Sequence, residues 1–143
     1  MGKRLIGSVG LAIAGGTPSP YTRTTSFVIA CSDETTALTT GTKVTFRLPF
    51  AFTVTEVRAS LTTAGTGANL VTLMFEQNGT DILSTAITID ATETTSTTAS
   101  TPPVILTSAL TDDASIDCDV DQIDSGELVQ GLRCILLGIK HFE

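Results

Sequence analysis

The segment spanning residues 43–61, KVTFRLPFAFTVTEVRASL, limits the possible folds of this chain more than any other stretch. Apolar and polar residues alternate through its first half, which is the period of a strand with one buried face. Pro49 has no N–H to donate to a ladder, so it marks a bend or a sheet edge. After Val54 the alternation slips by one residue, which predicts a β-bulge. The expected inward side chains are Val44, Phe46, Leu48, Phe50, Phe52, Val54, Val57, Ala59 and Leu61.

The rest of the chain extends this strand pattern. About eight short apolar runs are separated by Gly, Pro or Asn turns, and no convincing amphipathic helix interrupts them. Such a series predicts an all-β fold, an antiparallel β-sandwich or jelly roll that forms one domain over residues 23–143. The expected strands cover residues 25–31, 43–50, 52–61, 70–77, 82–90, 104–106, 116–120 and 132–140.

Three local features refine this expectation. Asn78-Gly79 suits the positive φ angles of a tight turn, so the strands on either side of it should form a hairpin. The low-complexity run at residues 91–101 fits a flexible linker, a loop or an exposed edge strand. The last strand, 132–140, is apolar on both faces, which indicates a central place in a sheet, packing between sheets, or a subunit interface.

Charge and composition exclude some classes of function. Charged residues make up 16% of the chain and the formal net charge is −7. Nucleic acid is therefore not an expected partner, because phosphate binding requires clustered Lys and Arg. No apolar run approaches the length of a membrane span, so we expect no membrane insertion. Abundant Thr and Gly with few charges favour an extracellular or particle-surface β-protein.

The three cysteines, Cys31, Cys118 and Cys134, lie far apart in the sequence and form no CxxC pair. With a single histidine in the chain, they do not resemble a four-ligand zinc site. Two readings stay open: all three are small buried apolar side chains, or at least one disulfide forms within or between chains.

Candidate site residues are few. Asp117, Asp119 and Asp121 alternate along one strand, which puts them on one face roughly 6.6–7 Å apart. A straight strand cannot bring three such carboxylates to one calcium ion, so they are weak metal candidates, and a solvated strand face explains them better. No catalytic motif and no paired carboxylates are apparent. We therefore expect a protein that is not an enzyme and uses no cofactor.

The first 22 residues predict an extended arm that precedes the domain. A basic pair, an apolar run and small residues give this segment some likeness to a secretion signal, but two glycines interrupt its short apolar run. A Gly-rich apolar arm cannot fold alone, so we expect it to dock on another chain, or else to add a strand to its own domain. The expected anchoring side chains are Leu5, Ile6, Val9, Leu11 and Ile13.

Three sequence stretches carry a resemblance to a known family: TFRLPFAFTVTEVRASLTTAGTG, ILSTAITIDATETTSTTASTPPVI and DDASIDCDVDQI. Together they resemble a β-sandwich domain that recurs in virion proteins of tailed bacteriophages, and the likeness covers residues 43–140. The resemblance implies a structural protein of head-decoration or fibre type without catalytic residues. Cys118 and Cys134 depart from it, since aliphatic residues are expected at these two positions.

The N-terminal arm and the resemblance to phage virion domains together predict a capsid decoration or cement protein on the surface of a phage particle. Its partners would be the major capsid protein or other virion proteins, and copies of itself in a homotrimer. The alternative is a receptor- or glycan-binding module of a phage fibre or bacterial surface protein.

Overall fold

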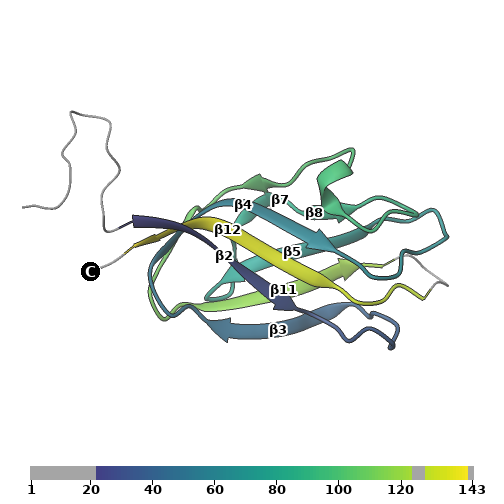
Figure 1. Ribbon diagram of the computed structural model, residues 1–143, viewed down its shortest axis with the longest axis horizontal. Coiled ribbons are helices and arrows are strands. Elements are labelled where there is room, and N and C mark those ends of the chain that lie inside the picture. The colour runs from purple at the N-terminus through teal and green to yellow at the C-terminus, as the bar shows by residue number, and fades with distance from the viewer. Residues whose placement is uncertain (1–21, 124–127, 142–143) are drawn as a thin grey trace, which may run out of the picture.

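The computed structural model describes residues 22–123 and 128–141, and it folds them into two large antiparallel sheets packed face to face and a separate two-stranded sheet, β7-β9 (Figure 1). One sheet has the strand order β10-β4-β12-β2. The other has the order β3-β11-β5-β6, and β8 also pairs with β5. The strands are β2 (Thr22–Ala30), β3 (Gly41–Arg47), β4 (Phe52–Ser60), β5 (Val71–Gln77), β6 (Thr80–Asp81), β7 (Leu83–Thr85), β8 (Ile87–Ile89), β9 (Val104–Ile105), β10 (Ala109–Leu110), β11 (Ser115–Gln122) and β12 (Arg133–His141).

The strand order is that of a jelly roll. If β2, β3, β4, β5, β8, β10, β11 and β12 are counted one to eight along the chain, the first sheet reads 6-3-8-1 and the second 2-7-4-5. Successive strands therefore alternate between the sheets, except that the fourth and fifth, β5 and β8, pair with each other in one sheet, as in two interleaved Greek keys. The prediction of an all-β antiparallel sandwich is confirmed. Of the predicted arm, residues 1–21 lie outside the described residues.

The segment 43–61 folds as the alternation predicts. It forms β3, a bend at Pro49 and β4, and the register of β4 against β12 shifts at Thr55. This shift is the predicted bulge, which lets Val57 return to the core face after Val54. Gly138 lies opposite the bulge, where a Cβ atom would come within 2.0 Å of the Thr53 carbonyl oxygen.

The core fills the space between the two sheets. Its largest fully buried side chains are apolar and come from both sheets, Phe52 and Leu136 from one, Phe75 and Ile116 from the other. At one end of the sandwich, four phenylalanine rings form a continuous set with centroid distances of 5.2–6.4 Å. These rings are Phe27, Phe46, Phe50 and Phe52.

The return strand expected at residues 82–90 is interrupted. After the turn at Asn78-Gly79, only β6 continues the hairpin with β5. The chain then leaves the sheet so that β7 pairs with β9, and it returns as β8 to pair with the other end of β5. Hydrogen bonds of Ile82 to two different segments accompany this change of partner. Its N–H donates to the Phe75 carbonyl of β5, and its carbonyl accepts from the N–H groups of Leu106 and Thr107.

The low-complexity run 91–101 is a structured loop, so the linker interpretation is wrong. It contains a short 3-10 helix, η1 (Ser96–Thr98), whose N-cap is Thr95. Ser96 is buried, and its hydroxyl accepts a 2.9 Å hydrogen bond from the Ala59 N–H of β4. Within the described ranges, no helix is long and apolar enough to cross a membrane.

Candidate functional site

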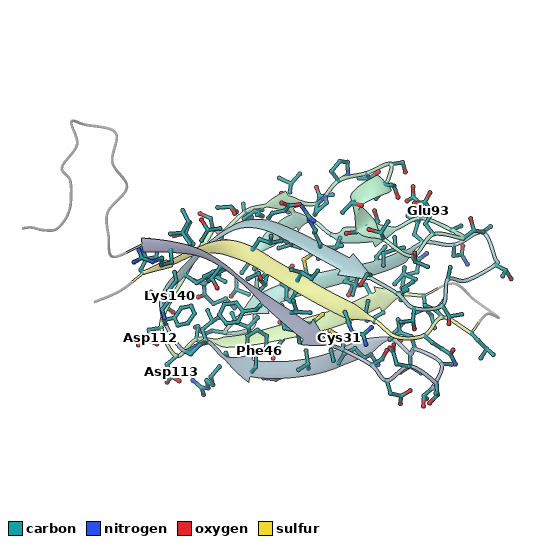
Figure 2. All side chains as sticks on the ribbon, viewed as in Figure 1. Cys31, Phe46, Glu93, Asp112, Asp113 and Lys140 are labelled. Atoms are coloured by element: carbon teal, nitrogen blue, oxygen red, sulfur yellow. The ribbon has the colours of Figure 1, made fainter. Side chains whose placement is uncertain are left out.

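The most concentrated group of chemically reactive side chains is a thiol cluster formed by Cys31, Cys118 and Cys134. Cys118 lies on the inner face of β11, in the middle of one sheet, and Cys134 lies on the inner face of β12, in the middle of the other. Cys31 follows the last residue of β2 and approaches them from the sheet edge (Figure 2). Three segments far apart in the chain therefore deliver one sulfur each to the centre of the sandwich.

The three sulfurs are in mutual contact. The Sγ–Sγ distances are 3.6 Å between Cys31 and Cys118, 3.3 Å between Cys31 and Cys134, and 3.2 Å between Cys118 and Cys134. These are contacts between free thiols, because a disulfide bond is only about 2.05 Å long. Of the two alternatives that the sequence allowed, the described structure has the buried thiols and has no disulfide among Cys31, Cys118 and Cys134.

Proximity couples the ionisation of the three thiols. Hydrogen bonds from Cys118 and Cys134 to a Cys31 thiolate lower the pKa of Cys31 to about 4, against the opposing effect of burial. The pKa of Cys134 is raised by its hydrogen bonds with Cys118 and Cys31 and by burial. For Cys118, the hydrogen bond with Cys134 lowers the pKa, but the bond with Cys31 and burial outweigh it. The cluster therefore gives up its first proton readily and resists losing more.

The spacing of the cysteines in the sequence does not show that they meet. The alternation of inward and outward residues along each strand does predict which face each cysteine occupies. Cys31 has the parity of Phe27 and Ile29, which face the core. Cys118 and Cys134 likewise occupy buried positions that alternate with exposed or half-buried ones. At all three positions the alternation predicts a side chain that faces the core. That the three side chains meet there is decided by the strand order of the two sheets.

The predicted acidic stripe is present on the outer face of β11 and is wider than the sequence suggested. Asp117 is paired in register with Glu76 of β5, and Glu76 is paired with Asp81 of β6. Burial raises the pKa of Glu76, and the charges of Asp119, Asp81 and Asp117 raise it further. We call Glu76, Asp81, Asp117, Asp119 and Asp121 the acidic row.

The acidic row does not gather around one point. Burial, followed by the charges of Asp119 and Asp81, raises the pKa of Asp121 as well. One carboxylate oxygen each of Asp117 and Asp119 is enclosed without a hydrogen-bond partner among the described residues. Within the described part of the chain, the thiol cluster is the group of ionisable side chains whose ligand atoms lie close enough to share one ion.

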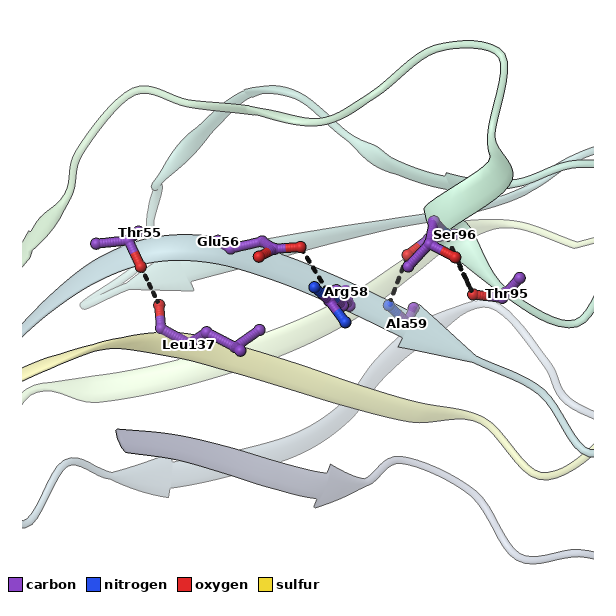
Figure 3. Close-up of polar contacts among 8 residues, drawn as sticks. Thr55, Glu56, Arg58, Ala59, Thr95, Ser96 and Leu137 are labelled. Atoms are coloured by element: carbon purple, nitrogen blue, oxygen red, sulfur yellow. Dashed lines mark hydrogen bonds and ion pairs between the residues drawn. The ribbon is translucent and has the colours of Figure 1, made fainter. Parts of the chain in front are cut away.

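A groove of about 660 Å³ lies along the free edge of β4. Beside it, β10 pairs only with Phe52 and Thr53, and η1 is fastened further along at Ala59. Figure 3 shows the wall of this β4 groove, where Glu56 and Arg58 form an ion pair of 2.5 Å. The lining residues are Thr55, Glu56, Val57, Arg58, Ser96, Thr97, Pro102, Pro103, Val104 and Ile105.

The outer face of the four-stranded sheet carries an aliphatic row. β12 is central between β2 and β4, and its inward residues already belong to the core. Its alternate residues are only half-buried and face away from the core. Val28, paired with Ile135, extends the row onto β2 and is 65% exposed. The outer aliphatic row consists of Val28, Ile135, Leu137 and Ile139.

The five anchoring side chains proposed for the arm, from Leu5 to Ile13, lie outside the described residues. Comparison with known protein families, with curated proteins and with solved structures finds no significant match to this chain.

Proposed function

We propose that this protein is a non-enzymatic structural component of a bacteriophage particle, a decoration or cement protein on the capsid surface. The observation that carries the proposal is the outer aliphatic row. β12 fills the core with one face, so the aliphatic side chains on its other face contribute nothing to the fold's own core. A row of aliphatic side chains that is outside the core and only half-buried is consistent with a protein–protein interface.

In this proposal the outer aliphatic row joins copies of the chain, as a homotrimer. The strip lies on a four-stranded sheet whose edge strand β2 also carries Val28 outward. A partner that covers the outward residues of both β2 and β12 needs a surface as wide as a sheet. Another copy of this chain has such a surface. The predicted arm of residues 1–22 runs into the first residue of β2, Thr22, and would attach the assembly to the capsid.

Particle binding is tested by deleting residues 1–21. Because the deletion removes none of residues 23–141, the far-ultraviolet circular dichroism of the truncated chain should still be that of a β-sheet protein. In gradient-purified particles, quantitative mass spectrometry should count hundreds of copies of the full chain and only background levels of the truncated one. Truncated protein at full occupancy would refute the role of the arm, and absence of the full chain from particles would refute the proposal.

Self-association is tested separately with Leu137→Lys, which places a charge in the centre of the outer aliphatic row. The matched control is Thr45→Lys, an exposed position of β3 on the other sheet. Sedimentation velocity should give a trimer for the full chain and the control, and a monomer for Leu137→Lys. A trimer in all three proteins would show that the row is not the interface.

The β4 groove supports a second candidate function, a receptor- or glycan-binding module. Its volume lies within the roughly 300–1,000 Å³ range of small-ligand sites, and Ser96 and Thr97 bring the threonine-rich loop to its rim. Arg58 and Glu56 would offer one donor group and one acceptor group to a sugar. Binding of the isolated chain to host cells, lost in Arg58→Ala and retained in Leu137→Lys, would favour this candidate.

A further inference from the structure

We propose that Cys31, Cys118 and Cys134 form a three-sulfur binding site for a thiophilic trivalent ion of the arsenic(III) type. The site is built from two sheets and a strand end, and it is independent of particle attachment. The argument rests on the number of sulfurs, their spacing and the charge that the surroundings tolerate.

The spacing of the sulfurs favours a pyramidal complex. A zinc ion with bonds of about 2.3 Å in a tetrahedral site separates its sulfurs by about 3.8 Å. The distances here are 3.2, 3.3 and 3.6 Å. Bonds of the same length at angles of about 90–100° give about 3.3–3.5 Å. Angles of that size are typical of trivalent arsenic, whose lone pair occupies the fourth direction.

Among the described residues, no further Cys, His, Asp or Glu side chain groups with the three sulfurs as a fourth ligand. Cys118 is flanked in its sheet by Val44 and Phe75, and Cys134 by Ile29 and Ala59. These four neighbours, on β3, β5, β2 and β4, are all apolar members of the core or packed against it. Zinc, which usually takes four ligands, would therefore be left incomplete, whereas a pyramidal ion needs no more than these three sulfurs.

Charge points to the same class of ion. Three thiolates around a divalent ion leave a net negative charge, which is costly in an apolar core. Three thiolates around a trivalent ion are neutral, so the complex can form in the core without an unpaired charge.

The binding reaction balances without an oxidant or reductant. Arsenous acid, As(OH)3, exchanges its three As–O bonds for three As–S bonds. Each thiol proton leaves with one hydroxide as water, so three water molecules are released and arsenic stays trivalent. Access begins at Cys31, which is 6% exposed at the end of an edge strand, while the other two sulfurs are fully enclosed.

The test is titration of the reduced full chain with arsenite under anaerobic conditions, followed by native mass spectrometry. The expected product is one arsenic per chain with three hydrogens lost. A complex with only two thiols keeps a hydroxyl group on arsenic and is heavier by one water, so the two products are distinguished directly. Because the ion links both sheets, the unfolding midpoint should rise by roughly 5–10 °C at a hundredfold excess over Kd.

Two variants and one control complete the experiment. Cys118→Ala and Cys31→Ala should each give the heavier two-thiol product, and Cys31→Ala removes a side chain at a strand end, where folding is less at risk. Val120→Ala removes buried volume from the same face of β11 but keeps all three thiols, so it should bind like the full chain. A two-thiol product with the unaltered chain, or an unchanged product with Cys31→Ala, would overturn the inference.

Discussion

Replacing Ser96 with alanine should loosen the threonine-rich loop from β4. The Ser96 hydroxyl accepts a 2.9 Å hydrogen bond from the Ala59 N–H, and both residues are buried. Next to this contact, the Leu61 N–H donates to the Thr94 carbonyl, so the loop is held at two points of β4. Ser96→Ala removes the acceptor at one of them and leaves the Ala59 N–H without a partner in the described structure.

The size of the effect follows from that unsatisfied N–H. A buried donor that loses its partner costs about 1–3 kcal/mol of unfolding free energy. For a domain of this size, each kcal/mol corresponds to a shift of about 3–4 °C, so the midpoint should fall by about 3–12 °C. Urea denaturation should give the same loss of free energy without a change in slope, because both proteins expose the same surface on unfolding.

The matched control is Thr97→Ala, one residue further along η1. Thr97 is exposed, and among the described residues its hydroxyl has one hydrogen-bond partner, the Thr95 hydroxyl at 2.9 Å. Its removal should change the unfolding free energy by less than about 0.5 kcal/mol. Equal stability of Ser96→Ala and Thr97→Ala would show that the Ser96–Ala59 bond does not fasten the loop, and the reasoning would fail.

Two further substitutions test the sheets themselves. Glu76→Gln should stabilise the protein at pH 7 by about 0.2–1 kcal/mol, the usual size of a cross-strand charge effect. The raised pKa of Glu76 means that the folded state holds its proton more tightly than the unfolded state, so this group's contribution to stability falls as pH rises above 4.5. Unfolding curves should therefore differ at pH 7 and converge near pH 4; parallel curves across this range would contradict the assignment. Gly138→Ala should destabilise by about 1–3 kcal/mol or more in urea, because its Cβ would lie 2.0 Å from the Thr53 carbonyl oxygen; wild-type stability would refute the close packing at the bulge.

Local sequence patterns determined the strands that fill the core. Alternation over residues 43–61 predicts the burial of Phe52 and Val54, and the slip after Val54 predicts the bulge at Thr55. These predictions succeed because a strand's side chains alternate between faces whatever its partners are. The same parity places Cys118 and Cys134 in the interior before any partner strand is known.

Local sequence patterns did not predict which strands pair with each other or where a strand is interrupted. The sequence cannot show that β7 leaves the sheet to pair with β9, because that choice depends on a segment about twenty residues away along the chain. The same limit applies to the run 91–101, whose repetitive composition left a linker, a loop and an exposed edge strand open. Its order comes from a buried hydroxyl that meets the edge of β4, a contact invisible in the run itself.

The sequence by itself determined that this chain is a sandwich of antiparallel strands with an apolar last strand, because periodicity and turn residues act locally. Only the tertiary structure decided that the outer side of β12 is left uncovered by the described chain, and that Cys31, Cys118 and Cys134 share one point. Both follow from the jelly-roll strand order, which sets β12 between β2 and β4 and places β11 opposite them. Strand order depends on contacts across the whole chain, and no local pattern encodes it.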